Sequence, residues 1–237
     1  MRLDKFLTEH NIGSRSEVKK LIKSGHVTVN DVIIKENDIK ITDEDHIAVN
    51  GSLISHKKFY YYMFHKPAGC VSACQDDLNP TVMDYFKNCD RIKELFPVGR
   101  LDKDTEGLLL ITNDGDFSHK LTSPKKHVYK KYYFESDSPL SSDATKRMKE
   151  GITLKDGMIC KPAVLELADA NSGTLSITEG AYHQIKRMVA ACGGHVTYLK
   201  RLSIGKLLLD PSLEKGTYRE LTEEEKCQAI CQSAEQI

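Results

Sequence analysis

The chain has little of what marks a membrane or secreted protein. No apolar run in its 237 residues approaches the roughly 18 residues that cross a membrane. The opening residues, MRLDKF, lack the apolar stretch on which a signal peptide depends. No internal repeat or low-complexity segment is present either. These absences predict a globular cytoplasmic protein with no membrane partner.

Cysteine chemistry is equally sparse. The sequence holds 7 cysteines, an odd number, and no two of them form a Cys-x-x-Cys pair. The looser pairs, Cys70 with Cys74 and Cys227 with Cys231, have no accompanying pair of histidines. This pattern is typical of reduced thiols and not of a disulfide framework or a zinc site. We therefore expect no metal.

The chain also lacks a net charge, since 34 basic residues balance 34 acidic residues. A neutral total argues against a nucleic-acid partner, but the charges are unevenly spread. Residues 1–30 hold 6 Lys and Arg against 3 Asp and Glu. Residues 117–134 and 180–209 hold 5 basic residues each and no acidic one. Such segregation is compatible with a phosphate-binding face, although any one stretch is equally explained as a solvated surface.

The first fifty residues predict a small unit of two helices and a sheet. Leu3, Phe6 and Leu7 are spaced for one face of a short helix. Ser14 and Glu17 have the spacing of a capping box, which begins a second helix. Short apolar runs predict strands at residues 27–29, 32–34, 39–41 and 47–49.

After a polar joint the sequence changes to alternating strand-like and helix-like segments. The strand-like runs begin at residue 59 and recur at 108–111, 129–134, 164–167, 175–177 and 207–209. Helical stretches lie between them, at residues 81–87, 117–121, 142–150 and 181–192. This order predicts an α+β fold, in which a mainly antiparallel mixed sheet is flanked by helices. We expect a module at residues 1–56, a linker at 57–59 and a larger domain at 60–237.

The most informative stretch is residues 99–115, which read GRLDKDTEGLLLITNDG. It places one carboxylate, Asp102, between an arginine and a glycine-bounded polar turn, and an apolar strand follows at once. An aspartate in such a place either caps the turn or is presented as a catalytic group at the end of a rigid sheet. The residues alone leave both interpretations open.

This stretch resembles the catalytic motif of the pseudouridine synthases, in which the aspartate after Gly-Arg-Leu is the nucleophile. Two further segments resemble the same family in the same order. Residues 130–132 read KKY, where the family has a tyrosine that stacks near the target base. The resemblance assigns this role to Tyr132, with the register open because Tyr133 follows. Residues 179–188 read EGAYHQIKRM, where the family places a basic residue against the aspartate, and Lys186 fits that place.

The chemistry explains why these residue types are wanted. The resemblance implies an isomerase that detaches a uracil from its ribose, turns it and rejoins it through carbon. A carboxylate must be ionised to attack, and an adjacent lysine favours the ionised form. A tyrosine offers a stacking face, and its hydroxyl can take up a proton. The reaction needs no cofactor. We interpret His183 as a structural hydrogen-bonding residue and Asp104 as a turn former, while an ordinary packing role for Tyr132 stays open.

A second resemblance concerns the first unit. Residues 13–30 are similar to the alpha-L RNA-binding module of the ribosomal protein S-four type. Two short helices with basic residues on one side would supply phosphate contacts, which position a protein on RNA without reading bases. The alternative is that these lysines only keep the helix soluble. The residues expected to bind RNA are Arg2, Arg15, Lys19, Lys20 and Lys23 in the module and Arg100, Lys130 and Arg187 in the larger domain.

The resemblance covers nearly the whole chain and is nearest to the RsuA-type synthases, which modify small-subunit ribosomal RNA. It implies a monomer whose partner is 16S ribosomal RNA or a small-subunit assembly intermediate. His65 and Ala181 depart from the residues common in the family. The alternatives are a synthase for 23S RNA and a non-catalytic RNA-binding assembly factor. A methyltransferase on the same module would need a glycine-rich cofactor loop after a strand, and the sequence has none.

Overall fold

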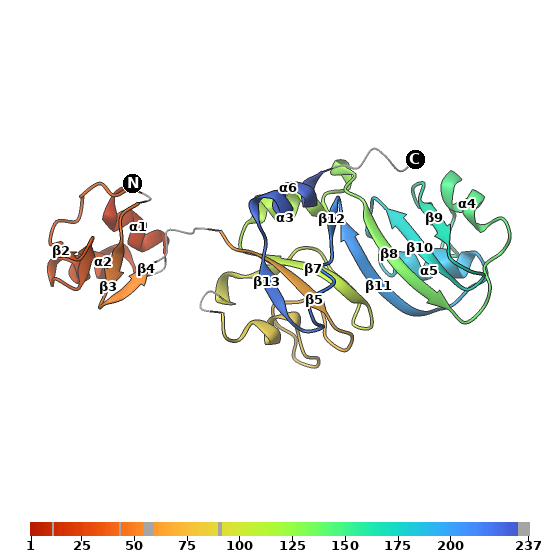
Figure 1. Ribbon diagram of the computed structural model, residues 1–237, viewed down its shortest axis with the longest axis horizontal. Coiled ribbons are helices and arrows are strands. Elements are labelled where there is room, and N and C mark those ends of the chain that lie inside the picture. Colours follow the sequence, from red (N-terminus) through yellow and green to blue (C-terminus); the bar gives the residue numbers. More distant parts are fainter. Residues whose placement is uncertain (11, 43, 55–58, 90–91, 232–237) are drawn as a thin grey trace. The chain divides into compact units, whose positions relative to one another are not determined.

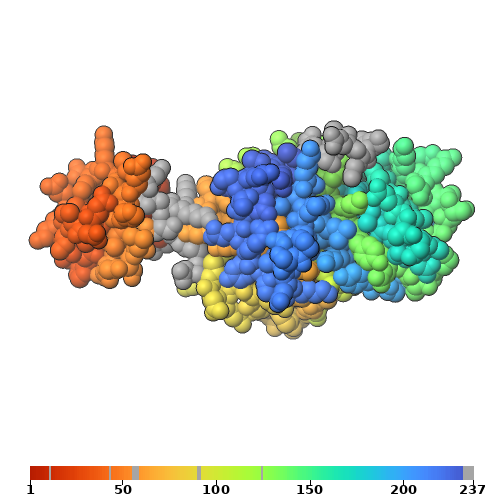
Figure 2. Space-filling model, in the orientation of Figure 1, coloured from red at the N-terminus to blue at the C-terminus, as the bar shows by residue number. Residues whose placement is uncertain are grey.

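The computed structural model describes residues 1–10, 12–42, 44–54, 59–89 and 92–231. The chain divides into two compact units, Met1–Lys58 and Phe59–Ile237 (Figures 1 and 2). Of the linker expected at 57–59, residues 57 and 58 lie outside the described residues. Within the described ranges, no helix is both long enough and apolar enough to span a membrane.

The first unit packs two helices on a four-stranded antiparallel sheet of order β2-β1-β3-β4. Its elements are α1 (Leu3–Glu9), α2 (Arg15–Lys23), β1 (Val27–Val29), β2 (Val32–Ile33), β3 (Ile47–Val49) and β4 (Ser52–Ile54). The expected capping box begins α2, because the Ser14 hydroxyl accepts from the Glu17 amide and the Glu17 carboxylate accepts from the Ser14 amide. Leu3, Phe6 and Leu7 are fully buried in the core of this unit, as their spacing predicts.

The strand expected at 39–41 is wrong. This segment forms no named strand and makes one isolated bridge, from Lys40 to Arg2. Its backbone pairs with the start of the chain, since the Leu3 amide donates to the Ile39 carbonyl at 2.9 Å and the Ile41 amide to the Met1 carbonyl at 2.7 Å. Ile41 is buried all the same, so its apolar pattern reflects contact with the core and not membership of the sheet.

The second unit is built on one mixed sheet of order β13-β5-β7-β11-β8-β10-β9, with β12 paired to β11 and β6 to β7. Among the strand pairs in the described residues, β7 and β11 run parallel and the others antiparallel. The strands are β5 (Tyr61–Lys66), β6 (Phe96–Pro97), β7 (Glu106–Thr112), β8 (Lys130–Ser136), β9 (Val164–Leu167), β10 (Ser172–Ile177), β11 (Val196–Ile204), β12 (Leu207–Leu208) and β13 (Tyr218–Glu220). The expected α+β fold with a mainly antiparallel mixed sheet is confirmed.

Helices cover both faces of this sheet and bury two apolar cores. The α-helices are α3 (Gly115–Thr122), α4 (Ala144–Glu150), α5 (Gln184–Ala191) and α6 (Glu223–Ile230), and the 3-10 helices are η1 (Val82–Phe86), η2 (Ile92–Glu94) and η3 (Pro124–Lys126). Alternate residues of β7 enter opposite cores: Leu109 packs with the core of α4 and α5, and Leu108 with the core of α3 and α6. All seven residues of β7 are therefore buried.

Further elements differ from the sequence prediction, and the short strands β4, β6 and β13 are also not among the predicted ones. Strand β11, the longest in the sheet, is not among the predicted strands. The segment 81–87 forms the 3-10 helix η1 and not an α-helix. The charged segment after Leu221 forms a regular helix, α6, whose first turn is capped by Thr222 and Glu225.

Candidate active site

A buried lysine fixes the loop that carries Asp102. Lys66 ends β5 and is fully buried. Its Nζ donates to four carbonyl oxygens, those of Pro67 (3.0 Å), Asp102 (3.1 Å), Lys103 (3.4 Å) and Thr105 (2.8 Å). Burial lowers the pKa of Lys66 from its ordinary value. One ammonium thus gathers the peptide groups of the whole turn, which holds the backbone at Asp102 in a defined position.

A glycine closes this turn for a steric reason. Gly107 is the second residue of β7 and lies beside Arg201 of the parallel strand β11. A Cβ at this position would meet the Arg201 carbonyl oxygen at 2.2 Å, and its φ of +105° disfavours any other residue. The glycine after the Asp102 turn therefore lets β7 and β11 come together directly behind the loop.

Asp102 and Asp104 share one lysine from the facing helix. Lys186, in the first turn of α5, places Nζ 3.2 Å from Asp102 Oδ2 and 2.6 Å from Asp104 Oδ1. Burial lowers the pKa of Lys186, but hydrogen bonds to Asp104 and Asp102 raise it by more, so its pKa lies above the ordinary value. The lysine therefore remains charged at neutral pH and forms an ion pair with both carboxylates. Asp104, interpreted above as a turn former, is also a partner of this lysine.

His183 precedes α5 and also approaches the carboxylate. Its Nε2 lies 3.6 Å from Asp102 Oδ1, and its backbone has the left-handed conformation, with φ of 48°. Its ring stacks on that of Tyr182, with 3.9 Å between centroids, and the Tyr182 side chain is largely exposed. The interpretation of His183 as a purely structural residue is therefore incomplete, because the structure places it within reach of Asp102.

Tyr132 forms the opposite side of the same site. It lies on β8 and is 7% exposed, and it lines a small cavity of about 70 Å³ together with Asp102, Lys186 and His183. Tyr133 does not line this cavity; its side chain is on the other face of the strand, where its hydroxyl donates to Glu135 at 3.1 Å. The geometry thus favours Tyr132 in the register that the sequence left open.

The packing of helix α5 determines where its basic side chains lie. Ile185, Met188 and Val189 pack into the core of the larger unit, as their spacing predicts. Lys186 and Arg187 are left on the side away from that core. Arg187 forms an ion pair with Asp156, and its Nη1 donates to the Tyr182 carbonyl at 3.2 Å. Its charge is therefore already matched in this structure.

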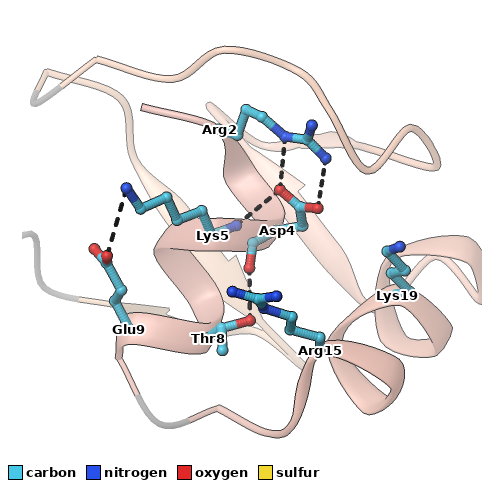
Figure 3. Close-up of a pocket in the computed structure, with 7 residues that line it drawn as sticks. All are labelled: Arg2, Asp4, Lys5, Thr8, Glu9, Arg15 and Lys19. Carbon is cyan, nitrogen blue, oxygen red and sulfur yellow. Dashed lines mark hydrogen bonds and ion pairs between the residues drawn. The ribbon is translucent and has the colours of Figure 1, made fainter.

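The basic residues of the first unit are not equivalent (Figure 3). Arg2, Arg15 and Lys19 line one hollow of about 430 Å³. Arg2 is turned onto Asp4, to which it donates two hydrogen bonds, of 3.0 and 2.7 Å. Figure 3 draws no interaction from Arg15 or Lys19 to the other residues of the hollow. Lys20 and Lys23 are exposed on α2, and neither lines the hollow.

The arrangement around Asp102 suits nucleophilic or proton-transfer chemistry on a planar ring. It combines a carboxylate of fixed backbone position, a charged lysine paired with it and a buried tyrosine that lines the same small cavity. In the described part of the chain, no three His, Cys, Asp or Glu side chains gather in a way that could hold a metal ion.

Two functional residues are absent from the expected site residues. Lys66 is not among them, yet its contacts with the carbonyls of Asp102, Lys103 and Thr105 shape the Asp102 turn. Arg201 was counted only in a basic stretch, yet it is 2% exposed and pairs with Tyr132 across the sheet. A signal existed for Lys66, because a lysine at the end of an apolar strand is oddly placed. No local pattern signals the burial of Arg201, since it depends on the pairing of β11 with β7 at Gly107.

Comparison with known proteins identifies the family of both units. Residues 60–191 match the family described as RNA pseudouridylate synthase, and residues 1–47 match the S4 domain. An uncharacterized RNA pseudouridine synthase of Bacillus subtilis (strain 168) is 44% identical over 230 residues, which cover 95% of this chain and 96% of the relative. The ribosomal small subunit pseudouridine synthase A of Escherichia coli (strain K12) is 40% identical over 227 residues, which cover 95% of this chain and 98% of the relative.

The fold gives the same result. A crystal structure of a pseudouridylate synthase matches with a TM-score of 0.69 and 40% identity, covering 97% of this chain and 99% of the other. The likeness thus extends over both units and through all three segments around the cavity. The chain belongs to the RNA pseudouridylate synthase family and is a pseudouridine synthase.

Proposed function

We propose that this enzyme converts one uridine of 16S ribosomal RNA into pseudouridine, with Asp102 as the nucleophile. The observation that carries the catalytic assignment is the contact of 3.2 Å between Lys186 and Asp102, opposite Tyr132 in one cavity. The small-subunit target is supported by the Escherichia coli relative, whose name specifies the ribosomal small subunit. We place the reaction in the cytoplasm, on free RNA or on a partly assembled particle, with the enzyme acting as a monomer.

Each of the three residues has a distinct part in the proposal. Asp102, kept ionised by Lys186, attacks the substrate or removes a proton from its sugar. In this proposal Tyr132 stacks on the uracil while the base is detached and turned, and its hydroxyl oxygen takes up the proton lost from carbon 5 as the hydroxyl's own proton passes to solvent. Attack at the sugar, addition to the base and a glycal intermediate all fit these roles.

The target uridine must leave its helix to reach this cavity. Extruding a base from folded RNA costs a few kcal/mol, which contacts to the flanking backbone must offset. Arg100 lies beside Asp102 and is exposed, so it is placed to grip the strand or to fill the gap left by the base. The basic side chains of the first unit, chiefly Arg15 and Lys19, would add contacts to phosphates farther along the RNA.

The test is a map of pseudouridines in 16S and 23S RNA from cells that lack this gene. The strain is complemented with the wild type, with Asp102→Ala or with Asp116→Ala, a control that removes an exposed carboxylate of α3. We expect one 16S site to be lost and then restored by the wild type and the control, but not by Asp102→Ala.

Other outcomes would redirect the proposal. Restoration of the site by Asp102→Ala would refute the nucleophile. Loss of a 23S site would keep the chemistry and change the target. An unchanged map would favour a non-catalytic role in ribosome assembly.

A further inference from the structure

A second cavity adjoins the one that holds Asp102. It has a volume of about 290 Å³ and shares Arg100, Tyr132 and Gly180 with the first. Its remaining lining comes from the loop before β7, the end of α3 and the strands β8 and β11. Lys130 and Arg201 are among these residues. The two cavities thus meet at Tyr132, the residue proposed to stack on the target base.

The charge in this second cavity is uncompensated. Three of its lining residues are basic, namely Arg100, Lys130 and Arg201, and none is acidic. Burial lowers the pKa of Lys130 to about 8, and the nearby positive charge of Arg201 lowers it further in the same direction. Around Asp102, by contrast, one lysine faces two carboxylates. Cations are seldom brought together in a buried place without an anion, because both burial and mutual repulsion oppose it.

Arg201 has unused hydrogen-bonding capacity in this place. It is 2% exposed, and its Nε donates to the Leu108 carbonyl at 2.7 Å. Its Nη1 lies 3.5 Å from the Tyr132 hydroxyl, while its Nη2 is buried and has no hydrogen-bond partner. Lys130 likewise donates to a single acceptor, the Val128 carbonyl at 3.2 Å, although an ammonium has three protons to give.

We propose that Lys130 and Arg201 form a binding site for one backbone phosphate of the substrate RNA, next to the target uridine. The proposal rests on the proposed function, since it takes the strand to be the one whose uridine enters the Asp102 cavity. A phosphodiester carries one negative charge and several acceptor oxygens. It would accept hydrogen bonds from Arg201 Nη2 and Lys130 Nζ and offset their repulsion.

The position of the site favours a phosphate of the RNA strand over a free anion. The cavity shares Arg100, Tyr132 and Gly180 with the Asp102 cavity, so an anion bound in it would adjoin a base bound against Tyr132. Strands β8 and β11 hold these residues in fixed register, because Arg201 lies opposite Tyr132 and Ile204 lies opposite Lys130. A phosphate held here would thus fix the ribose relative to the aromatic ring and to Asp102.

The test replaces single phosphates of the RNA by uncharged methylphosphonates. Oligonucleotides that contain the target uridine are made with one such group at each phosphate from two before to two after that uridine. Binding is measured with Asp102→Asn, which prevents turnover, and with the same variant carrying Lys130→Met. At one position, we expect the methylphosphonate to weaken binding to the Asp102→Asn protein about tenfold. In the protein that also carries Lys130→Met, the same methylphosphonate should weaken binding less than about twofold. Lys130→Met should also lower the salt slope of binding by about one.

Matched controls separate this site from general charge and from folding. Lys131→Met removes the next lysine of β8, which pairs with Glu166 on the other side of the strand, and should leave the position-specific effect intact. Arg201→Met removes the bond to Leu108 and is interpreted only where its melting temperature matches that of the parent. Lys130→Met tests the phosphate site independently of Arg201→Met, because Lys130 is only partly buried.

The outcomes distinguish the possible failures. Equal methylphosphonate effects in both proteins at every position would overturn the phosphate site. A rise in melting temperature with inorganic phosphate alone that Lys130→Met abolishes, without any position-specific effect in RNA, would reassign the cavity to a free anion and overturn it too. If the wild type binds the RNA but forms no pseudouridine, the proposed function fails, while the binding data still decide the phosphate site.

Discussion

The two units of the chain hold their positive charges in opposite ways. In the first unit, Lys19, Lys20 and Lys23 stand exposed on α2. In the second, Lys66 and Arg201 are buried, and each touches defined backbone carbonyls. The exposed charges are alike and loosely placed, whereas the buried ones have individual geometry. This difference predicts that the first unit attracts RNA by its electrostatic field and that the second orients the RNA through single contacts.

The largest effect is expected at the lysine that faces Asp102. Lys186→Met should lower kcat by about a thousandfold, equivalent to about 4 kcal/mol, because an oriented charge is lost where Asp102 must stay ionised. RNA affinity should change little, and single-turnover kinetics with a tritium-release assay would separate the two. Lys186→Arg retains the charge and should keep more activity than Lys186→Met. Equal losses in both would show that this cation is not needed for its charge.

The next effect concerns stability and tests whether a buried cation is structural. Lys66→Met should reduce the free energy of unfolding by about 3 kcal/mol, because carbonyls of the Asp102 turn lose their donor. Urea denaturation would measure it. The control is Lys146→Met, which breaks an exposed ion pair with Glu150 on α4 and should cost under about 1 kcal/mol. Similar losses for the two variants would contradict the buried role.

A smaller effect is expected from the exposed charges of the first unit. Replacing Lys19, Lys20 and Lys23 together by glutamine should weaken RNA binding about tenfold at low salt and lower its salt slope by about two. Stability and kcat at saturating RNA should stay unchanged, because these side chains are solvated. Lys5→Gln, which removes a lysine near Glu9, is the matched control. An unchanged slope would return the three lysines to a role in solubility.

The smallest effect is a pH dependence that follows from the pKa of Lys130. This pKa is about 8, below the ordinary value, so the free enzyme loses the Lys130 charge as pH rises through 8. Arg100 and Arg201, which face the same cavity, stay charged, and the Tyr132 hydroxyl faces it too. RNA affinity should therefore fall about fourfold between about pH 7 and about pH 8.5. Lys130→Arg stays charged throughout and should abolish this part of the decline; if both proteins decline equally, Lys130 is not responsible.

Deprotonation of Lys130 affects folding stability in the opposite direction to RNA affinity. The folded state holds the Lys130 proton more weakly than the unfolded chain does. Unfolding therefore takes up a proton between about pH 8 and the ordinary lysine value, and this residue's contribution to stability rises with pH in that window.

Local patterns in the sequence predicted the elements whose side chains repeat regularly. The capping box at Ser14 begins α2 as expected, and the apolar stripe of α5 is buried as its spacing requires. The proximity of Lys186 to Asp102, expected from the family resemblance, is present at 3.2 Å. Their catalytic roles, and those of Tyr132 and the RNA-binding residues, stay predictions.

Other features depended on contacts that no local pattern encodes. Strand β11 reads as a basic stretch because Lys200 and Arg201 interrupt it, yet it is central in the sheet. Arg201 can be buried there only because Gly107 leaves room for its backbone and a cavity lies at its side chain. His65, a departure from the family, is buried with Nδ1 donating to the Leu213 carbonyl at 2.7 Å, and burial lowers its pKa. Each case is settled by a partner distant in sequence.

The complete burial of β7 has a consequence for motion. The Asp102 loop leads directly into this strand, whose residues enter both cores of the unit. Opening β7 would expose both cores together, so its amides should exchange with solvent only on global unfolding. Local breathing that admits a nucleotide must therefore come from the opposite side of the cavity, where Tyr182 and His183 precede α5. Hydrogen exchange should therefore be slow for the amides of β7 and fast for those around Tyr182 and His183.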